Sequence, residues 1–467
     1  LAEREGYRRI EHAKRYTTLG MGTDQGRIAG LNGVAVLAEA QGLEPSAIGN
    51  SRPRPPFSPV SFGAMAGPFV GDLLQPVRTT QLDHWHRANG ATMANVGAWR
   101  RPQLYARPGE SDLDAVIREA RMVRTTVGMI DVGTLGKIDL QGPDVGRLLD
   151  FAYINGFSRL KPGACRYGVM LREDGMVLDD GTVTRLGEDR WFMTTGTGNA
   201  ERVLAQLERI RQIDLPGLDV SITLVSDHWG AIAIAGPHAR RVLTALGANF
   251  DCGNEALPFM RMAEGTLAGI PSRVLRVSFS GELAYEIYTP ASRAIDMWEA
   301  IQGAGRSFDI GPYGTEAMMT LRIEKGLFVP GFEADGRTTP DDLGIGHMVG
   351  KTKEFIGRRS LKREAFMAPG RRQMVGIMAT DPAAEIPRGA QITRAFPRDG
   401  ITPMLGPVTS LAFSPELGRW IGLALIADGR ALTGETCFAA APLAERTVPV
   451  TVCNPVFVDP EGSRLRD

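Results

Sequence analysis

Residues 166–186 read "RYGVMLREDGMVLDDGTVTRL", in which two apolar runs are joined by a tight-turn signal and followed by paired acids. The dipeptide Asp174-Gly175 is typical of β-hairpin turns, and the apolar residues on both sides of it are typical of strands. The stretch therefore predicts a hairpin with Asp179 and Asp180 after its turn. Successive side chains of a strand point to opposite faces, so only one of these acids can enter a given pocket.

Strict alternation would place Asp179 on the side of Val177, and Asp180 on the side of Leu178. Both sides thus carry an apolar neighbour, and the pattern leaves open which acid faces inward. Two acids at a solvated strand end, bracing the next turn, need no function at all. On the residues alone, this solvated strand end is the favoured interpretation.

Helical and strand patterns interleave on both sides of the hairpin, which predicts an α+β fold. Ser111 begins an amphipathic helix whose apolar residues recur at helical spacing as far as Val123. Further helices are predicted at 143–152, 199–210, 238–246 and 314–326. Further strands are predicted at 137–142, 191–195, 229–236 and 272–280. Beyond Pro369, short apolar runs split by Gly and Pro predict a small C-terminal β barrel or jelly roll.

The length of 467 residues exceeds what one hydrophobic core usually spans, so we expect two or three domains, with a Pro/Arg-rich linker at 50–59. Lys plus Arg and Asp plus Glu both number 53, so no global field would draw the chain to nucleic acid or to an anionic membrane. The four cysteines are widely spaced, which favours buried free thiols over a zinc site. No metal site is expected.

The N-terminal sequence "LAEREGYRRIEHAKR" is charged and lacks the apolar core of a signal peptide. No apolar run reaches the roughly 20 residues of a membrane span. A cytoplasmic location is therefore expected. The first residue is Leu rather than Met, from which we expect a portion of a longer chain or a split subunit.

Two further stretches carry charged residues whose role the pattern leaves open. In "SGELAYEIY", alternation predicts a strand on which Glu282 and Glu286 share a face, either as one functional and one exposed carboxylate or as two surface acids. In "LRIEKG", Arg322 and Glu324 fit a surface ion pair. Alternatively, the planar guanidinium of Arg322 fits a site for a ligand carboxylate.

Motifs in the order of one known family run from the centre of the chain to its end. They are "IDVGTLGKIDLQGPD", "RYGVMLREDGMVLDDGTVTRL", "RVSFSGELAYEIY", "TLRIEKG" and "VTSLAFSPELGRWIGLAL". In this order they resemble the folate-binding aminomethyltransferase (glycine-cleavage T-protein) family over roughly residues 60–467. The resemblance implies a folate-binding module of mixed α/β subdomains, followed by the small β barrel.

Other stretches resemble the C-terminal half of the alpha subunits of heterotetrameric sarcosine oxidases. They are "EHAKRYTTLGMGTDQGR", "EKGLFVPGFEADGRTTPDDLG" and "KEFIGRRSL". In those proteins this region follows a nucleotide-binding half. The resemblance therefore implies that residues 1–60 are a segment joined to a missing N-terminal nucleotide-binding half, residues 61–368 the folate-binding region and residues 369–467 the barrel domain.

The same resemblance assigns a folate site residue by residue. The first acid of the family's pair, which lies against the reactive nitrogens of tetrahydrofolate, corresponds to Asp179. Asp179 is thus expected to face folate, and Asp180 to point away. Tyr167 corresponds to a tyrosine that lines the folate pocket, and Glu286 to a glutamate that hydrogen-bonds the pterin.

Other positions of the implied site depart from the family's pattern. Phe279 replaces the usual tyrosine, which keeps stacking but removes a hydroxyl, and Thr195 replaces a pterin-contacting asparagine. Leu135 completes the implied folate-binding set. Residues 317–319 read Ala-Met-Met where the family has Ala-Arg-Asp, so Arg322 is expected to take part of the missing arginine's role at the folate tail.

The resemblance implies a reaction that begins on a flavin-bearing partner, with FMN or FAD on the beta subunit or at the subunit interface. That partner would oxidise the N-methyl group of sarcosine to an imine. This chain would hold tetrahydrofolate beside the imine carbon, which gives 5,10-methylenetetrahydrofolate before water can release formaldehyde. Asp179 would stabilise the developing positive charge and carry a proton. Smaller subunits of a hetero-oligomer are also implied, and an NAD site only in the missing half.

Three alternatives remain on the sequence. The chain could be a glycine-cleavage T-protein acting on an aminomethyl-lipoyl carrier, or the folate module of a dimethylglycine-type oxidase or dehydrogenase. It could also be a noncatalytic folate-binding or tRNA-modification factor. That last group typically carries a Cys after Lys-Gly, whereas Lys325-Gly326 is followed here by Leu327.

Overall fold

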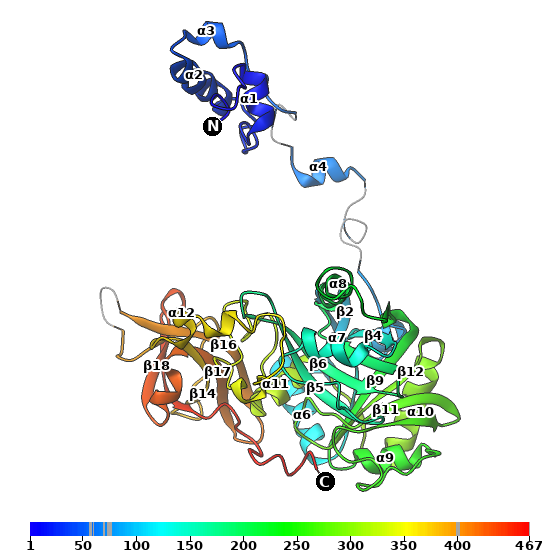
Figure 1. Cartoon of the computed structure of the whole chain (residues 1–467). Coiled ribbons are helices and arrows are strands. Elements are labelled where there is room, and N and C mark those ends of the chain that lie inside the picture. Colours follow the sequence, from blue (N-terminus) through cyan, green and yellow to red (C-terminus); the bar gives the residue numbers. More distant parts are fainter. Residues whose placement is uncertain (56–57, 59, 69–70, 72–76, 398–401, 467) are drawn as a thin grey trace. The chain divides into compact units, whose positions relative to one another are not determined.

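The computed structural model describes residues 1–55, 58, 60–68, 71, 77–397 and 402–466, and the chain divides into two compact units, Leu1–Pro76 and Val77–Asp467 (Figure 1). Of the linker expected at 50–59, residues 56, 57 and 59 lie outside the described residues. None of the described helices is both long and apolar enough to cross a membrane.

The first unit is a small helical body with an apolar core of its own. Its helices are α1 (Ile10–Tyr16), α2 (Ala29–Gln41), α3 (Pro45–Ile48) and α4 (Phe62–Ala66). Ile10 of α1 lies in one buried cluster with Leu37 and Ala38 of α2. Helix α2 ends at Gly42, whose φ of 64° is the left-handed conformation that favours glycine at this position.

In the second unit, the predicted hairpin begins a five-stranded antiparallel sheet in the order β5-β6-β7-β4-β8. Its strands are β4 (Gly136–Gln141), β5 (Cys165–Leu171), β6 (Val177–Arg185), β7 (Arg190–Thr195) and β8 (Ser221–Leu224). The turn at Asp174-Gly175 is confirmed, with Gly175 at a φ of 89°. Strand β6 runs through Gly181, which continues the ladder opposite Gly168.

Two helices cover one face of this sheet. They are α7 (Val145–Ala152) and α8 (Ala200–Arg209). Leu148 of α7 and Leu207 of α8 lie in one buried cluster with Ile138 and Met193 of the sheet. The periodicity that predicted both helices is the one that buries these apolar faces.

A second sheet has six strands in the order β10-β11-β12-β9-β3-β13. Its strands are β3 (Gly128–Asp131), β9 (Trp229–Ala235), β10 (Met262–Leu267), β11 (Ile270–Leu275), β12 (Ala284–Pro290) and β13 (Gly311–Pro312). Helices α9 (Ala239–Ala245) and α10 (Ala294–Gly305) pack on one face, where Trp298 meets Ile234 and Tyr285. The other face meets the five-stranded sheet in a cluster that includes Phe192 and Tyr288.

The remaining α-helices and strands of the second unit lie outside the two larger sheets and the barrel. They are α5 (Asp83–Ala88), β1 (Thr92–Val96), β2 (Trp99–Leu104), α6 (Asp112–Thr125), α11 (Thr315–Glu324) and α12 (Glu364–Met367).

The C-terminal domain is a closed barrel in the order β14-β17-β16-β15-β18-β19. Its strands are β14 (Arg372–Ala379), β15 (Gln391–Thr393), β16 (Met404–Ser414), β17 (Arg419–Ala427), β18 (Thr436–Ala441) and β19 (Arg446–Cys453). The predicted α+β class with a C-terminal β barrel is confirmed.

Candidate functional site

A β-bulge in β6 decides how the paired acids point. In the pairing with β5, Asp179 stands opposite Met170, but Val177 stands opposite Leu171. Leu178 is therefore an extra residue on β6 without a partner of its own, which is the defining feature of a bulge. A bulge interrupts the strict alternation of side chains.

The apolar clusters on the two sides of the sheet agree with this arrangement. Leu178 lies in the cluster beneath α7 and α8, and Val177 lies in the cluster that reaches the barrel. The prediction that Val177 and Asp179 share a side is therefore wrong. Asp179 points to the helix-covered side of the sheet, and Asp180 points to the opposite side.

Asp179 is bound at the start of α8. It is buried, and its carboxylate accepts hydrogen bonds from the backbone N–H of Gly196 at 3.2 Å and from the side-chain amide of Asn199 at 2.9 Å. Asn199 is the residue directly before α8. These bonds give Asp179 a structural role that joins β6 to the loop before the helix.

Asp180 is the acid that meets Tyr167. The Tyr167 hydroxyl donates a hydrogen bond to Asp180 Oδ2 at 2.7 Å, and both residues are only partly buried. On the same face of the sheet, the hydroxyl oxygens of Thr182 and Thr194 lie 2.8 Å apart. Tyr167, which was expected to line the folate pocket, therefore contacts the second acid of the pair and not the first.

Glu286 lies on β12 of the facing sheet and accepts a hydrogen bond from the Tyr288 hydroxyl. Ala284 and Tyr288 stand two positions before and after Glu286, so they share its face of the strand. Both lie in the cluster between the two sheets. The rings of Tyr288 and Phe192 are 5.0 Å apart between centroids. Glu286 therefore points toward the five-stranded sheet, on the side that carries Asp180.

The pKa values of Asp179, Asp180 and Glu286 are all raised above the usual value of a carboxyl group. Among the described residues, none of the ion pairs involves Asp179, Asp180 or Glu286. Burial raises the pKa of Asp180 to about 6, although the hydrogen bond from Tyr167 lowers it. Burial and the neighbouring Asp180 raise the pKa of Asp179 to about 7. Burial also raises the pKa of Glu286. Asp180 can therefore both accept and release a proton near neutral pH.

The loop that carries Leu135 is fixed by a buried charge. Lys137 is fully buried and donates to the backbone carbonyls of Gly133 at 2.7 Å and of Leu135 at 2.9 Å. Burial lowers the pKa of Lys137 to about 8, and the carboxylates of Asp131, Asp227 and Glu286 oppose this shift. Lys137 therefore lies within electrostatic range of Glu286.

The other predicted positions fall in two places. Thr195 is buried, donates to the Gly196 carbonyl at 3.1 Å and follows Thr194, so it lies on the face of Asp179 rather than that of Asp180. Phe279 is partly buried in the connection between β11 and β12.

Arg322 does not take the place expected for it. Its guanidinium is fully buried and donates to Glu333 Oε2 at 2.9 Å and to the Leu327 carbonyl at 2.9 Å. It also donates to the Ser410 hydroxyl of β16. The predicted surface pair of Arg322 with Glu324 is therefore wrong, and the charge of Arg322 is bound by Glu333 rather than available to a folate tail.

Several important residues were not predicted from the sequence. Lys137 gave no sign of burial, because it alternates with Asp139 and Gln141 along the predicted strand and so fits the polar face of that strand. Arg124 had none either, because its partners Glu282 and Glu324 lie 158 and 200 residues away in the sequence. Only the folded chain brings them together.

Family models match most of the chain. The GCVT N-terminal domain matches residues 82–353, and the glycine cleavage T-protein C-terminal barrel domain matches residues 372–459. The sarcosine oxidase A3 domain matches residues 1–68.

Curated relatives fall into two groups. The sarcosine oxidase subunits alpha of Corynebacterium sp. strain U-96 and of Rhizobium meliloti are 44% and 42% identical, over 98% and 100% of this chain. The chain spans only 48% and 47% of the length of these two proteins. The aminomethyltransferase of Streptomyces coelicolor is 33% identical over 77% of this chain and 91% of its own.

A solved aminomethyltransferase structure is also similar to this chain. The crystal structure of the glycine cleavage system aminomethyltransferase T from Bartonella henselae superposes with a TM-score of 0.71 at 26% identity. The match covers 82% of this chain and 98% of that one.

Proposed function

Because this chain belongs to the aminomethyltransferase (glycine-cleavage T-protein) family, we propose that it transfers a one-carbon unit to tetrahydrofolate as the folate-binding part of a sarcosine oxidase alpha-type protein. The sequence is 44% identical to a sarcosine oxidase subunit alpha over 98% of this chain, which supports the assignment to a sarcosine oxidase alpha-type protein. The A3-domain match at residues 1–68 supports it too.

The observation that carries the proposal is the presence of two carboxyl groups, Asp180 and Glu286, that belong to none of the described ion pairs and lie on the facing sides of the two sheets. Asp180 with Tyr167 and Glu286 with Tyr288 lie on the inner faces of the two sheets. A pterin presents N–H donors, and carboxylates without a bound cation are suitable acceptors for them. The residues present therefore fit a reduced folate.

In this proposal each residue has a stated role. Tetrahydrofolate, when bound, supplies the nucleophilic nitrogens that capture an electrophilic carbon. Glu286 accepts an N–H of the pterin and fixes its orientation, while the Tyr288 hydroxyl keeps the carboxylate in place. Phe279 packs against the ring system.

Asp180 has the acid–base role that the family resemblance implied for Asp179. Its carboxylate faces inward, its pKa of about 6 suits proton exchange, and Tyr167 holds it in position. An anion in a poorly solvated site also stabilises positive charge that develops on a nearby nitrogen. We therefore move the proposed proton-carrying role from Asp179 to Asp180.

The electrophilic carbon would come from a flavin-bearing beta-type subunit that oxidises the N-methyl group of sarcosine. Smaller subunits would complete the hetero-oligomer, and the reaction would take place in the cytoplasm. We keep the expected domain division at 1–60, 61–368 and 369–467 as part of this proposal.

A second candidate is a T-protein acting on an aminomethyl-lipoyl carrier. The 91% coverage of the Streptomyces coelicolor aminomethyltransferase favours it, and the extra segment at residues 1–68 disfavours it. The folate module of a dimethylglycine-type oxidase or dehydrogenase differs only in the amine that its partner oxidises.

Calorimetric titration of tetrahydrofolate into the full chain tests the proposal. We expect saturable binding at one site per chain. No saturable heat at millimolar ligand would overturn it. Product analysis with the flavin-bearing partner then separates the two candidates, because only the first gives 5,10-methylenetetrahydrofolate from sarcosine.

A further inference from the structure

The turn that carries Phe279 contains hydrogen bonds between residues close in sequence. Within it, the Gly281 N–H donates to the Ser278 hydroxyl at 3.1 Å, and the Glu282 N–H donates to the Ser280 hydroxyl at 3.2 Å. Gly281 has a φ of 85°, and a Cβ there would approach the Lys325 side chain to 2.8 Å. The turn therefore packs closely against the end of α11.

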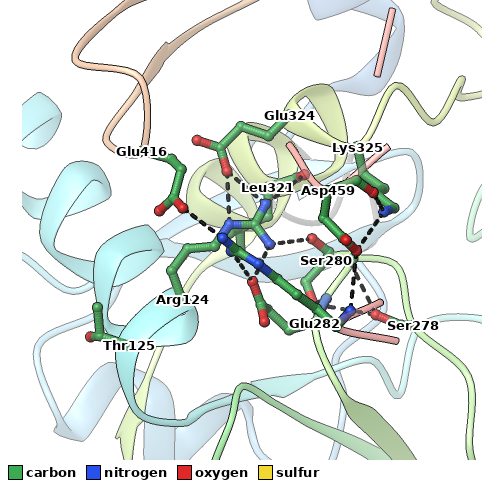
Figure 2. Close-up of polar contacts among 12 residues, drawn as sticks. Arg124, Thr125, Ser278, Ser280, Glu282, Leu321, Glu324, Lys325, Glu416 and Asp459 are labelled. Carbon is green, nitrogen blue, oxygen red and sulfur yellow. Dashed lines mark hydrogen bonds and ion pairs between the residues drawn. The ribbon is translucent and has the colours of Figure 1, made fainter. Parts of the chain in front are cut away.

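Arg124 lies near the C-terminal end of α6 and binds the Ser278–Glu282 turn (Figure 2). Its Nη1 donates to the Ser280 carbonyl and to Glu282 Oε1, each at 2.8 Å. Its Nε and Nη2 donate to Glu324 Oε2 at 2.9 and 2.6 Å. A single guanidinium thus binds the turn's backbone, the turn's acid and α11 together.

The C-terminal tail binds the same carboxylate oxygen of Glu282 as Arg124 does. Arg464 donates to Glu282 Oε1 at 2.9 Å and to Glu416 Oε1 at 2.7 Å. Lys325 pairs with Asp459 Oδ2 at 3.1 Å, and hydrogen bonds from Ser463 and Lys325 hold the pKa of Asp459 at about 2 despite the opposing effect of burial. Figure 2 shows Lys325 and Asp459 beside the Ser278–Glu282 turn.

Glu282 was expected to share a strand face with Glu286 as a functional or surface acid. Instead it precedes β12, is 3% exposed and is bound by both arginines. Its carboxylate is therefore a fixed anchor at one end of the turn, and Phe279 lies three residues before it. Displacing Glu282 must displace Phe279, since the internal hydrogen bonds make the turn move as a unit.

We propose that Arg124 and Arg464 are positioning residues that together fix Glu282, and so set the affinity for reduced folate through the placement of Phe279. This inference rests on the proposed function. It makes the C-terminal tail, which is remote in sequence, a determinant of binding at the site.

The test must avoid variants that simply unfold. Removing Arg124 would take away a cation that pairs with the buried carboxylates of Glu282 and Glu324. Breaking a buried ion pair in this way is strongly destabilising. Arg464→Gln is milder, because the Arg464 side chain is 34% exposed and Arg124 still neutralises Glu282. Arg124→Lys keeps the charge but loses the planar fork.

A matched control exists in the same unit. Arg371 pairs with buried Asp342 and has a side chain that is 22% exposed. Arg371→Gln therefore breaks a comparable pair, at a place that touches none of the residues of the Ser278–Glu282 turn for which contacts are described.

Tetrahydrofolate dissociation constants would be measured by calorimetry on the full chain for wild type, Arg464→Gln, Arg124→Lys and Arg371→Gln. Each of the first two variants would also be made with Phe279→Ala. We expect Arg464→Gln and Arg124→Lys to weaken binding about fivefold or more, Arg371→Gln to change it less than about twofold, and the first two effects to vanish in the Phe279→Ala background.

Each other outcome overturns a distinct claim. Wild type that does not bind overturns the proposed function. Wild type that binds, with Arg464→Gln and Arg124→Lys equal to it, overturns the positioning role alone. Losses that persist at full size beside Phe279→Ala overturn the route through Phe279, because independent effects add.

Discussion

At the scale of single residues, Asp180 combines an inward-facing carboxylate with a raised pKa. A carboxyl whose pKa is about 6 in the folded chain and near 3.9 when unfolded binds more protons in the folded state between these values. Its contribution to stability is therefore complete below about pH 4 and is lost as the pH rises through about 6. A neutral side chain at this position would not show that loss.

Asp180→Asn should accordingly gain stability relative to wild type as the pH rises. Between pH 5 and pH 8 we expect the difference in free energy of unfolding to move in favour of the variant by about 1 kcal/mol. Urea unfolding at both pH values measures this. Asp296→Asn, at a half-exposed acid of α10, serves as the control. A difference that does not change with pH would contradict the environment described for Asp180.

At the scale of secondary structure, the bulge in β6 and the start of α8 work together. The extra residue Leu178 turns Asp179 toward the loop before the helix, where Gly196 and Asn199 bind its carboxylate. The bulge thereby separates the two acids into one structural and one inward-facing group. Without it, strict alternation would reverse their positions.

Asn199→Ala should reveal the structural half of this division. The change removes one hydrogen bond to a buried carboxylate and should lower the free energy of unfolding by about 1–2 kcal/mol. Denaturant unfolding at pH 8 is the measurement, and tetrahydrofolate affinity should stay within about twofold of wild type. Unchanged stability would show that Asp179 does not need this partner.

The sequence could predict the hairpin but not its bulge. Asp174-Gly175 specifies the turn through local backbone preferences, which are readable from the residues. The position of Leu178 depends on which residues of β5 stand opposite it, and that pairing is set by packing of the whole sheet. The acid pair was therefore found from the sequence, while the direction of each acid was not.

The same limit applies to the buried charges. Glu286 and Tyr167 follow from motifs that are continuous in the sequence. Arg124 joins residues that lie 156 to 200 positions away, and its own helix pattern gives no sign of burial. Arg322 likewise finds Glu333 and Ser410 only in the fold.

At the scale of the whole molecule, the site residues all belong to the second unit. The first unit has a separate apolar core, and none of the residues 1–76 that the structure describes is among the site residues. A protein of residues 77–467 should therefore fold alone and bind tetrahydrofolate with an affinity within about twofold of the full chain. Calorimetry on both proteins checks this. Loss of binding by the shorter protein would show that the first unit takes part in the site.

The most direct test of the central claim compares Asp180→Asn with Asp179→Asn in the enzyme assembled with its flavin-bearing partner. Formaldehyde and 5,10-methylenetetrahydrofolate would be quantified from sarcosine in the presence of tetrahydrofolate. We predict that Asp180→Asn leaves sarcosine oxidation intact but lowers the yield of 5,10-methylenetetrahydrofolate about tenfold or more, with formaldehyde in its place. Asp179→Asn should keep the wild-type product. A product change in Asp179→Asn, with Asp180→Asn like wild type, would contradict the account.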